Sequence, residues 1–323
     1  MKSVLAAITT CKRKPEMVER AVKSVIAQTY TDWELVVVDD SPEDYEFRDE
    51  VRRLVEDWSI RDSRIRYIAH DKNYGAQRAR NTALNIAIDE GFEFIAFLDD
   101  DDEWLPEKLE KQIAKFSECD ENTALVYCNG YILQTGKDRK CIKYIKLKEG
   151  YIYSDLLVQD FIGTFTSPLI RTECLRAIGG LDEEMPASHD YDTWIRLAER
   201  YNITFVGGEA LFVKHNEHDS ERISSDLRRY IFTYERILKK HERYLLEHKN
   251  VHRLAFYYLS SRCARAGEWD KCFEALKKAL ILQPSKCMVT MKKYLKYVMK
   301  KNTPEFLDIL INIKRKIKGE SIN

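Results

Sequence analysis

Residues 93–108 read Glu93-Phe-Ile-Ala-Phe-Leu-Asp-Asp-Asp-Asp-Glu-Trp-Leu-Pro-Glu-Lys108. The apolar run from Phe94 to Leu98 predicts a short buried strand, and four consecutive carboxylates, Asp99 to Asp102, end it. Like charges this close together repel one another, so a strand end with a purely structural role does not favour them. Carboxylate oxygens at a strand tip suit a hard divalent cation, which commonly holds a substrate diphosphate. A solvated acidic loop with an N-capping Asp is the other interpretation, and the run alone leaves both open.

The residues before this stretch predict a parallel α/β sheet. Residues 4–8 form an expected first strand, Pro15 opens a helix with apolar residues at helical spacing, and residues 33–38 form the next strand. A strand, a helix and a strand in this order make a right-handed unit with parallel strands. Ligands bind beyond the carboxyl ends of such strands, where this chain has the polar pairs Thr9-Thr10 and Asp39-Asp40.

Two arginines come next, at the start of an expected helix that follows Gly75. Arg78 and Arg80 can face the same anion, because the positive end of the helix adds to their field. A solvated helical face is the alternative. The first turn, residues 9–14, contains no Gly-rich phosphate loop, so we expect a metal and arginine to hold any phosphate. This pattern argues against a dinucleotide enzyme and against a P-loop NTPase.

Length and charge predict two parts. The 323 residues allow one large α/β domain and a smaller appendage. The formal net charge is zero, yet residues 224–323 contain 23 Lys and Arg against 10 Asp and Glu, whereas the first 223 contain 30 against 43. Eight cysteines without Cys-x-x-Cys spacing indicate free thiols in a reducing compartment and no zinc site. With no signal peptide and no long apolar run, we expect a cytoplasmic protein.

Seven motifs in a fixed order carry a resemblance to a known family. They are Ile8-Thr-Thr-Cys-Lys12, Val37-Val-Asp-Asp-Ser41, Asn73-Tyr-Gly-Ala-Gln-Arg-Ala-Arg-Asn81, Phe97-Leu-Asp-Asp-Asp-Asp-Glu-Trp104, Gly163-Thr-Phe-Thr-Ser-Pro-Leu-Ile-Arg171, Ile178-Gly-Gly-Leu-Asp182 and Ser188-His-Asp-Tyr-Asp-Thr-Trp-Ile-Arg-Leu197. Over about residues 3–224 the chain resembles the inverting glycosyltransferases of family 2. The resemblance implies a GT-A catalytic domain over residues 1–224, with a Rossmann-like, mixed but mainly parallel sheet flanked by helices. An all-α region over residues 225–323 would follow it.

The resemblance also assigns roles around the acidic run. It places Asp99 and Asp101, as the Asp-x-Asp motif, near the sugar nucleotide and its metal, with Asp101 as the favoured direct ligand. Asp100 would lie near the ribose. Arg80, together with Arg78, would lie near the diphosphate. These assignments imply a divalent cofactor, Mn²⁺ or Mg²⁺.

Other strand ends receive roles in the same way. Thr9 and Asp40, with Asp39, fall where the family holds the nucleoside base. His215 and His218 are three residues apart, and a surface pair of this kind usually has no metal. In the family a His beyond this strand often approaches the metal or diphosphate, and His215 is the better match, so we assign it as a metal ligand.

The expected general base comes from the start of a later helix. Asp190 and Asp192 are two residues apart, so on a helix they point about 200° apart and cannot act together. One can face the cleft while the other caps the helix or pairs with Arg196. The resemblance places the base at Asp190, for which a plain N-cap is the alternative. His189 stands where the family usually has Glu, which puts any contribution from that preceding carboxylate in doubt.

The expected chemistry is a single displacement with inversion. A carboxylate takes the proton of the acceptor hydroxyl, and a divalent ion neutralises the charge that grows on the leaving diphosphate. No second nucleophile for a two-step retaining route is evident. The expected donor is a nucleoside diphosphate sugar, with a UDP-sugar as first choice. The expected acceptor is a sugar, a lipid-linked group or a protein in the synthesis of a polysaccharide, glycolipid or glycoprotein, and we expect no nucleic acid partner.

The basic C-terminal region is expected to be helical. Residues 257–284 resemble one tetratricopeptide helix pair, which would have to stack on residues 231–246 and 294–313 to bury its apolar face. A docking surface for a membrane-borne acceptor or partner and a helical cap over the catalytic domain are both open. Lysines in residues 292–318 are candidates for peripheral contact with anionic lipid at the inner face of the membrane, and a solvated face explains them equally.

Two rival functions remain at this point. A metal-dependent nucleotidyltransferase also uses carboxylates in an α/β domain, but usually carries a Gly-rich loop after the first strand, which residues 9–14 lack. A non-catalytic scaffold would act through the helical tail. The presence of Asp101 and Asp190 argues against the scaffold.

Overall fold

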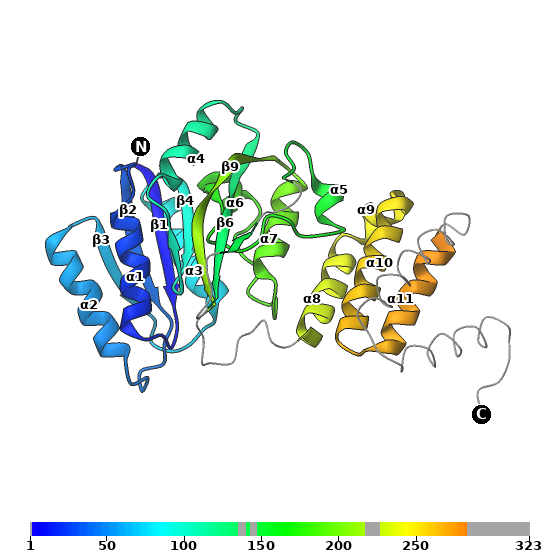
Figure 1. Cartoon of the computed structure of the whole chain (residues 1–323), viewed down its shortest axis with the longest axis horizontal. Coiled ribbons are helices and arrows are strands. Elements are labelled where there is room, and N and C mark those ends of the chain that lie inside the picture. Colours follow the sequence, from blue (N-terminus) through cyan, green and yellow to red (C-terminus); the bar gives the residue numbers. More distant parts are fainter. Residues whose placement is uncertain (1, 135–139, 143–146, 217–226, 283–323) are drawn as a thin grey trace. The chain divides into compact units, whose positions relative to one another are not determined.

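The computed structural model of the protein describes residues 2–134, 140–142, 147–216 and 227–282. The chain divides into two compact units, Met1–Glu242 and Arg243–Asn323, which are described separately below (Figure 1). The first unit contains the sheet and every residue assigned to the site. The second contains helices.

The described strands are β1 (Lys2–Thr10), β2 (Trp33–Asp39), β3 (Ile65–Ala69), β4 (Phe92–Asp99), β5 (Asp102–Trp104), β6 (Thr123–Gln134), β7 (Lys140–Ile142), β8 (Leu169–Arg171) and β9 (Asn202–Asn216). The helices of the first unit are α1 (Pro15–Ile26), α2 (Arg48–Arg61), α3 (Ala76–Asp89), α4 (Lys108–Ser117), α5 (Tyr153–Leu156), α6 (Thr172–Ala177), α7 (His189–Ala198) and α8 (Leu227–Lys240). Helix α9 (Glu242–Glu247) begins where this unit ends, and α10 (Lys249–Arg265) and α11 (Trp269–Leu282) follow.

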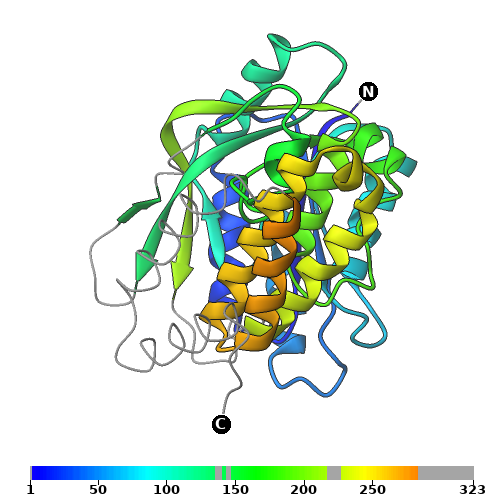
Figure 2. The same cartoon turned by 90° about the vertical axis from the view of Figure 1, so that its right-hand side faces the viewer.

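The strands form one mixed sheet in the order β3-β2-β1-β4-β8-β6-β9-β5, with β7 paired to β6. Strands β3, β2, β1 and β4 are parallel to one another, and β8 is antiparallel to β4 and to β6. Figure 2 shows β6 and β9 running side by side in the same direction. The predicted α/β fold class, a mainly parallel sheet flanked by helices, is confirmed.

Helices cover both faces of the sheet because its inner strands are apolar on both sides. Alternate residues of β1, such as Val4, Ala6 and Ile8, pack in one buried cluster with apolar residues of α1, α2 and α4. The intervening residues Leu5 and Ala7 are equally buried on the other face, where α3 contacts β1 and β4 (Figure 1). Strands buried on both faces read as continuous apolar runs, which is why the sequence showed them clearly.

The register of the parallel strands places the polar strand ends at one edge. Thr9 pairs with Asp99 across β1 and β4, and Thr10 pairs with Asp39 across β1 and β2. The chain leaves all three strands at this edge, so their loops lie above it. The short strand β5 then returns beside β9, with Asp102 opposite Lys214.

Helix α8 lies in the first compact unit, Met1–Glu242, and the predicted domain boundary at residue 224 stays a prediction. The hydroxyl of Tyr234 in α8 donates to the carbonyl of Leu157 at 2.7 Å, and the ammonium of Lys240 donates to Asp182 at 2.6 Å. In the other unit, α10 and α11 pack as a helix pair, and Gly267 makes the turn between them at a φ of 73°. Their likeness to a tetratricopeptide pair stays a prediction.

Several expectations fall on residues outside the described part. These are the second stacking segment of the tail at residues 294–313, the basic residues of 292–318, and His218. The six cysteines whose side chains are described are free thiols, as predicted. Among the described helices, none combines the length and apolar character needed to span a bilayer.

Candidate active site

Three carboxylates of the acidic run converge at the end of β4 and the start of β5. Asp99, Asp101 and Asp102 each offer an oxygen, and these oxygens lie within 4.8 Å of one another. Asp102 is fully buried, and its Oδ2 accepts a hydrogen bond from Thr166 Oγ1 at 2.7 Å. Its Oδ1 is buried without a hydrogen-bond partner in the described part of the chain. Buried acceptors are rarely left unpaired, so this set of oxygens fits a hard divalent cation.

Two arginines neutralise part of this negative charge. Arg80 Nη2 donates to Asp99 Oδ1 at 2.7 Å, and Arg13 Nε donates to Asp100 Oδ1 at 3.0 Å. Arg13 also lies 3.8 Å from Asp101 Oδ2. Burial raises the pKa of Asp100 to about 6, although the charge of Arg13 opposes the rise. Asp100 therefore faces Arg13 rather than the three clustered oxygens.

Arg78 and Arg80 have different partners in the structure, and their roles at a diphosphate stay predictions. The side chain of Arg78 is 56% exposed and lies 3.4 Å from Glu183. The side chain of Arg80 is 9% exposed, bonds Asp99, and lies over the ring of Phe165 at 4.3 Å. Residues two apart on a helix point about 200° apart, so only one of them reaches the sheet edge.

The two carboxylates at the end of β2 are buried and serve the local backbone. Asp39 accepts hydrogen bonds from the backbone of Ser41 at 2.8 Å and from the hydroxyl of Tyr67 at 2.8 Å. Asp40 accepts from the backbone of Gly75 at 2.7 Å, which fixes the loop that enters α3. Thr9 is partly exposed at the same edge. The roles of these residues at a nucleoside stay predictions.

Helix α7 separates its two aspartates as the sequence predicted. Asp192 is fully buried. Its Oδ1 accepts a hydrogen bond from the ammonium group of Lys240 at 2.6 Å, and its Oδ2 lies 3.4 Å from Arg196 Nη1, so Asp192 joins α7 to α8. Asp190 is partly exposed and accepts only the adjacent backbone N–H of Tyr191 among the described residues, at 2.8 Å. Burial is the main cause that raises the pKa of Asp190, and the charge of Asp99 adds to it. Asp190 therefore lies near enough to the acidic run for its charge to interact with that of Asp99.

Ser188, just before α7, is one of two described non-glycine residues with positive φ, at 48°; the other is Lys12, at 53°. This conformation costs roughly 1–3 kcal/mol and occurs preferentially at functional sites. At Lys12 the backbone N–H donates to Ser41 Oγ at 2.9 Å, which joins the first two strand ends. Ser188 directly precedes α7, the helix that carries Asp190.

His189 is held neutral beside Asp190. The amide nitrogen of Gln77 donates to the carbonyl of Met185 at 2.7 Å and lies 2.5 Å from His189 Nδ1. A carbonyl can only accept, so the Gln77 atom must be nitrogen and His189 Nδ1 must accept as well. Burial, with the charge of Arg80 as a second cause, lowers the pKa of His189 to about 4. His189 therefore adds no charge beside Asp190, whereas a Glu at this position would add a negative one.

Strand β9 brings a lysine to the site that the sequence did not reveal. Lys214 lies opposite Asp102 in the β5–β9 register. The neighbouring His215 points elsewhere: its Nε2 lies 3.5 Å from Glu103 Oε1, and it is absent from the group of clustered oxygens. Successive residues of a strand point to opposite faces, so Lys214 and His215 cannot both face the carboxylates. A metal-ligand role for His215 stays a prediction.

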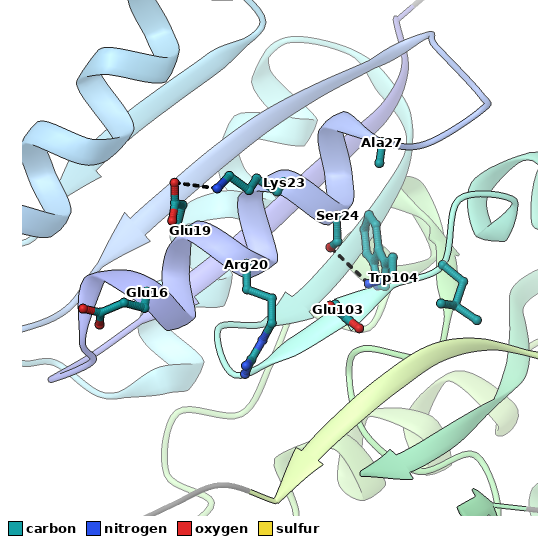
Figure 3. A pocket seen from close by; sticks show the side chains of 9 residues that line it. Glu16, Glu19, Arg20, Lys23, Ser24, Ala27, Glu103 and Trp104 are labelled. Carbon is teal, nitrogen blue, oxygen red and sulfur yellow. Dashed lines mark hydrogen bonds and ion pairs between the residues drawn. The ribbon is translucent and has the colours of Figure 1, made fainter. Parts of the chain in front are cut away.

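A pocket behind the acidic run is lined by α1 and β5, and it does not include the clustered carboxylates (Figure 3). Arg20 extends from α1 along its edge and donates to the carbonyl of Asp101 at 2.9 Å. Ser24 Oγ accepts the backbone N–H of Trp104 at 3.1 Å. These contacts fix the turn that carries Asp101, so this side of the run has a supporting role.

Replacing Asp102 by Asn tests the electrostatics of the group without any substrate. Burial raises the pKa of Asp102 well above its ordinary value, with Asp101 and Asp99 as further causes that outweigh Lys214. A carboxyl group whose pKa is raised in the folded state stabilises the fold below its unfolded pKa and loses that contribution as the pH rises through the folded pKa. At pH 7.5 with a chelator we therefore expect Asp102→Asn to raise the free energy of unfolding by roughly 1 kcal/mol or more.

Thermal melts at pH 7.5 and pH 4 check this expectation. The gain should shrink at pH 4, where the native carboxyl group takes up a proton. Added Mn²⁺ should stabilise the natural protein more than the variant, because the variant has lost one ligand charge. A variant that is less stable than the natural protein at pH 7.5 would contradict the inference that the buried charge of Asp102 destabilises the fold.

The sequence matches the model of glycosyl transferase family 2 over residues 6–178, which is more than half of the chain. The chain belongs to this family and is a glycosyltransferase.

Particular relatives agree with this assignment. The chain is 31% identical over 221 residues to the Putative colanic acid biosynthesis glycosyl transferase WcaA of Escherichia coli (strain K12), with 67% of this chain and 74% of the relative covered. It is 32% identical over 189 residues to the UDP-Glc:alpha-D-GlcNAc-diphosphoundecaprenol beta-1,3-glucosyltransferase WfgD of Escherichia coli, covering 58% of this chain and 67% of the relative.

Solved structures share the fold. S. aureus TarS 1-349 in complex with UDP-GlcNAc matches with a TM-score of 0.64 at 17% identity, covering 88% of this chain and 82% of that chain. The mannosyltransferase PcManGT from Pyrobaculum calidifontis in complex with GDP-Man and Mn²⁺ matches with a TM-score of 0.53 at 17% identity, covering 93% and 86%.

Proposed function

We propose that this glycosyltransferase moves a sugar with inversion from a nucleoside diphosphate sugar to a hydroxyl acceptor in the synthesis of a surface polysaccharide. The observation that carries the proposal is the presence of two kinds of carboxylate whose charges interact. Asp99, Asp101 and Asp102 form a group suited to a cation, while Asp190 is partly exposed and outside that group. A single base of this kind fits one displacement rather than a double one.

Each group of residues has a separate role in this reaction. Asp190 takes the proton of the acceptor hydroxyl, because its Oδ1 accepts only a backbone N–H among the described residues and its raised pKa favours proton uptake. Asp99, Asp101 and Asp102 would hold a divalent ion, Mn²⁺ or Mg²⁺, which when bound neutralises charge on the leaving diphosphate. Arg80 is the arginine placed to assist there, since Arg78 pairs with Glu183.

The comparisons support the choice of substrates. A relative's name specifies UDP-Glc as donor and a diphosphoundecaprenol-linked GlcNAc as acceptor, and another belongs to colanic acid synthesis. One structural neighbour holds UDP-GlcNAc, and another holds GDP-Man with Mn²⁺. We therefore propose a UDP-sugar as donor and a lipid-linked sugar as acceptor, with GDP-mannose as the competing donor.

The test is transfer itself. UDP-glucose, UDP-N-acetylglucosamine, UDP-galactose and GDP-mannose are offered with Mn²⁺ and a diphosphoundecaprenol-linked N-acetylglucosamine, and release of the nucleoside diphosphate is followed. We expect one donor to be consumed only when acceptor and metal are both present, and EDTA to stop the reaction. Proton NMR of the product should show an anomeric configuration opposite to that of the donor.

Two results would count against the proposal. A product with the anomeric configuration of the donor would exclude the single displacement. A protein that bound no nucleoside diphosphate would favour a scaffold acting through its tail. Family membership already decides against the nucleotidyltransferase alternative.

A further inference from the structure

Lys214 carries a charge for which the described residues provide no direct partner. It lies on β9 opposite Asp102 of β5 and is partly buried. In the described part of the chain, no hydrogen bond and no ion pair within 4.0 Å engages its ammonium group. By contrast, Arg80 and Arg13, the arginines at the same edge, each contact a carboxylate.

The surroundings of Lys214 are acidic on several sides. The carboxylates of Asp102, Asp99, Asp101 and Asp190 all interact electrostatically with its ammonium group. A lysine side chain is cationic at neutral pH, so its charge interacts both with the group suited to a cation and with the proposed base. A cation that interacts with both sets of groups is a candidate to bind an anionic substrate there.

We propose that Lys214 is a donor-binding residue whose ammonium group contacts the diphosphate of the nucleotide sugar. This inference rests on the proposed function. A long flexible stem lets the ammonium group move a few ångströms toward an anion, which the buried side chain of Arg80, bonded to Asp99 and packed on Phe165, does less easily. Without donor, Lys214 moderates the repulsion within the acidic run. With donor, it exchanges this diffuse interaction for a direct charge-assisted hydrogen bond.

Calorimetric binding of UDP, UMP and uridine to Lys214→Met, with and without Mn²⁺, tests the inference without requiring turnover. We expect UDP to bind roughly tenfold or more weakly, because a charge-assisted hydrogen bond to its diphosphate is lost. Uridine affinity should stay unchanged, since it carries no phosphate, and UMP should lose less than UDP. Lys214→Arg keeps the charge and should restore most of the UDP affinity.

The matched control is Lys115→Met. Lys115 also forms part of the first unit, but it pairs with Glu118 at 3.1 Å at the end of α4, so its loss should leave UDP affinity unchanged. If Lys214→Met does not fold, Lys214→Gln keeps a polar end and replaces it in the same assay. UDP affinity within twofold of the natural protein in the folded neutral variant would overturn the inference and leave Lys214 as a counter-charge only. If the natural protein itself bound none of UDP, GDP and dTDP, the proposed function would fail together with the inference.

Discussion

Asp190→Asn should lower the rate of sugar transfer by about 10³-fold, within the range that general-base catalysis contributes. The amide cannot take the acceptor proton, but it keeps the shape of the side chain and can still accept the N–H of Tyr191. Donor affinity should therefore stay within about twofold of that of the natural protein, because the acidic run is intact. Initial rates at saturating donor, together with calorimetric binding of UDP, separate the two effects.

The second aspartate of the same helix provides the control. Asp192→Asn removes a charge that pairs with Lys240 and Arg196, so it should lower thermal stability and leave the chemistry of the folded fraction unchanged. The pH profile adds a further readout. Because the pKa of Asp190 is raised and the base acts deprotonated, kcat/KM should fall with decreasing pH below a pKa that lies above the ordinary value of about 3.9. If the Asp190→Asn variant kept the turnover of the natural protein, Asp190 would not be the general base.

Asp101→Ala should abolish the metal dependence of donor binding. One of three converging carboxylates is lost, and the remaining pair includes Asp99, whose oxygen already bonds Arg80. A divalent ion contributes several kcal/mol of charge stabilisation, so we expect turnover to fall roughly 10²-fold or more. Titration of Mn²⁺ by electron paramagnetic resonance, and UDP binding with and without Mn²⁺, measure the loss directly.

Asp155→Ala is a matched control for this variant. Asp155 is an aspartate of the same unit whose carboxylate pairs with Lys148, and it is not part of the clustered group. It should bind Mn²⁺ and UDP as the natural protein does. If Asp101→Ala still bound UDP more tightly with Mn²⁺ than without it, Asp101 would not be a ligand, and Asp102 would become the principal candidate.

Much of the first unit could be predicted because its signals are local. Continuous apolar runs identified β1, β2 and β4, and the acidic run marked the end of β4. Asp190 and Asp192 could be separated in principle, since helix geometry turns one away from the other. The same rule, applied to Arg78 and Arg80, predicts that their side chains point apart.

Other groups could not be found from the chain alone. Arg13 comes from a loop with no distinctive pattern, and Lys214 reaches the site only because β5 pairs antiparallel with β9. Pairing of strands more than a hundred residues apart leaves no periodic trace in either segment. Asp102 was visible within the acidic run, but its burial and its bond to Thr166 depend on the loop before β8.

The order of residues was sufficient to establish the sheet, the polar strand ends and the family, because alternation, helical spacing and short motifs are properties of neighbouring residues. Which charges finally meet was decided by tertiary structure alone. The register of β5 against β9 brings Lys214 to the carboxylates and turns His215 toward Glu103, because side chains alternate along a strand and a partner strand determines which face is inside.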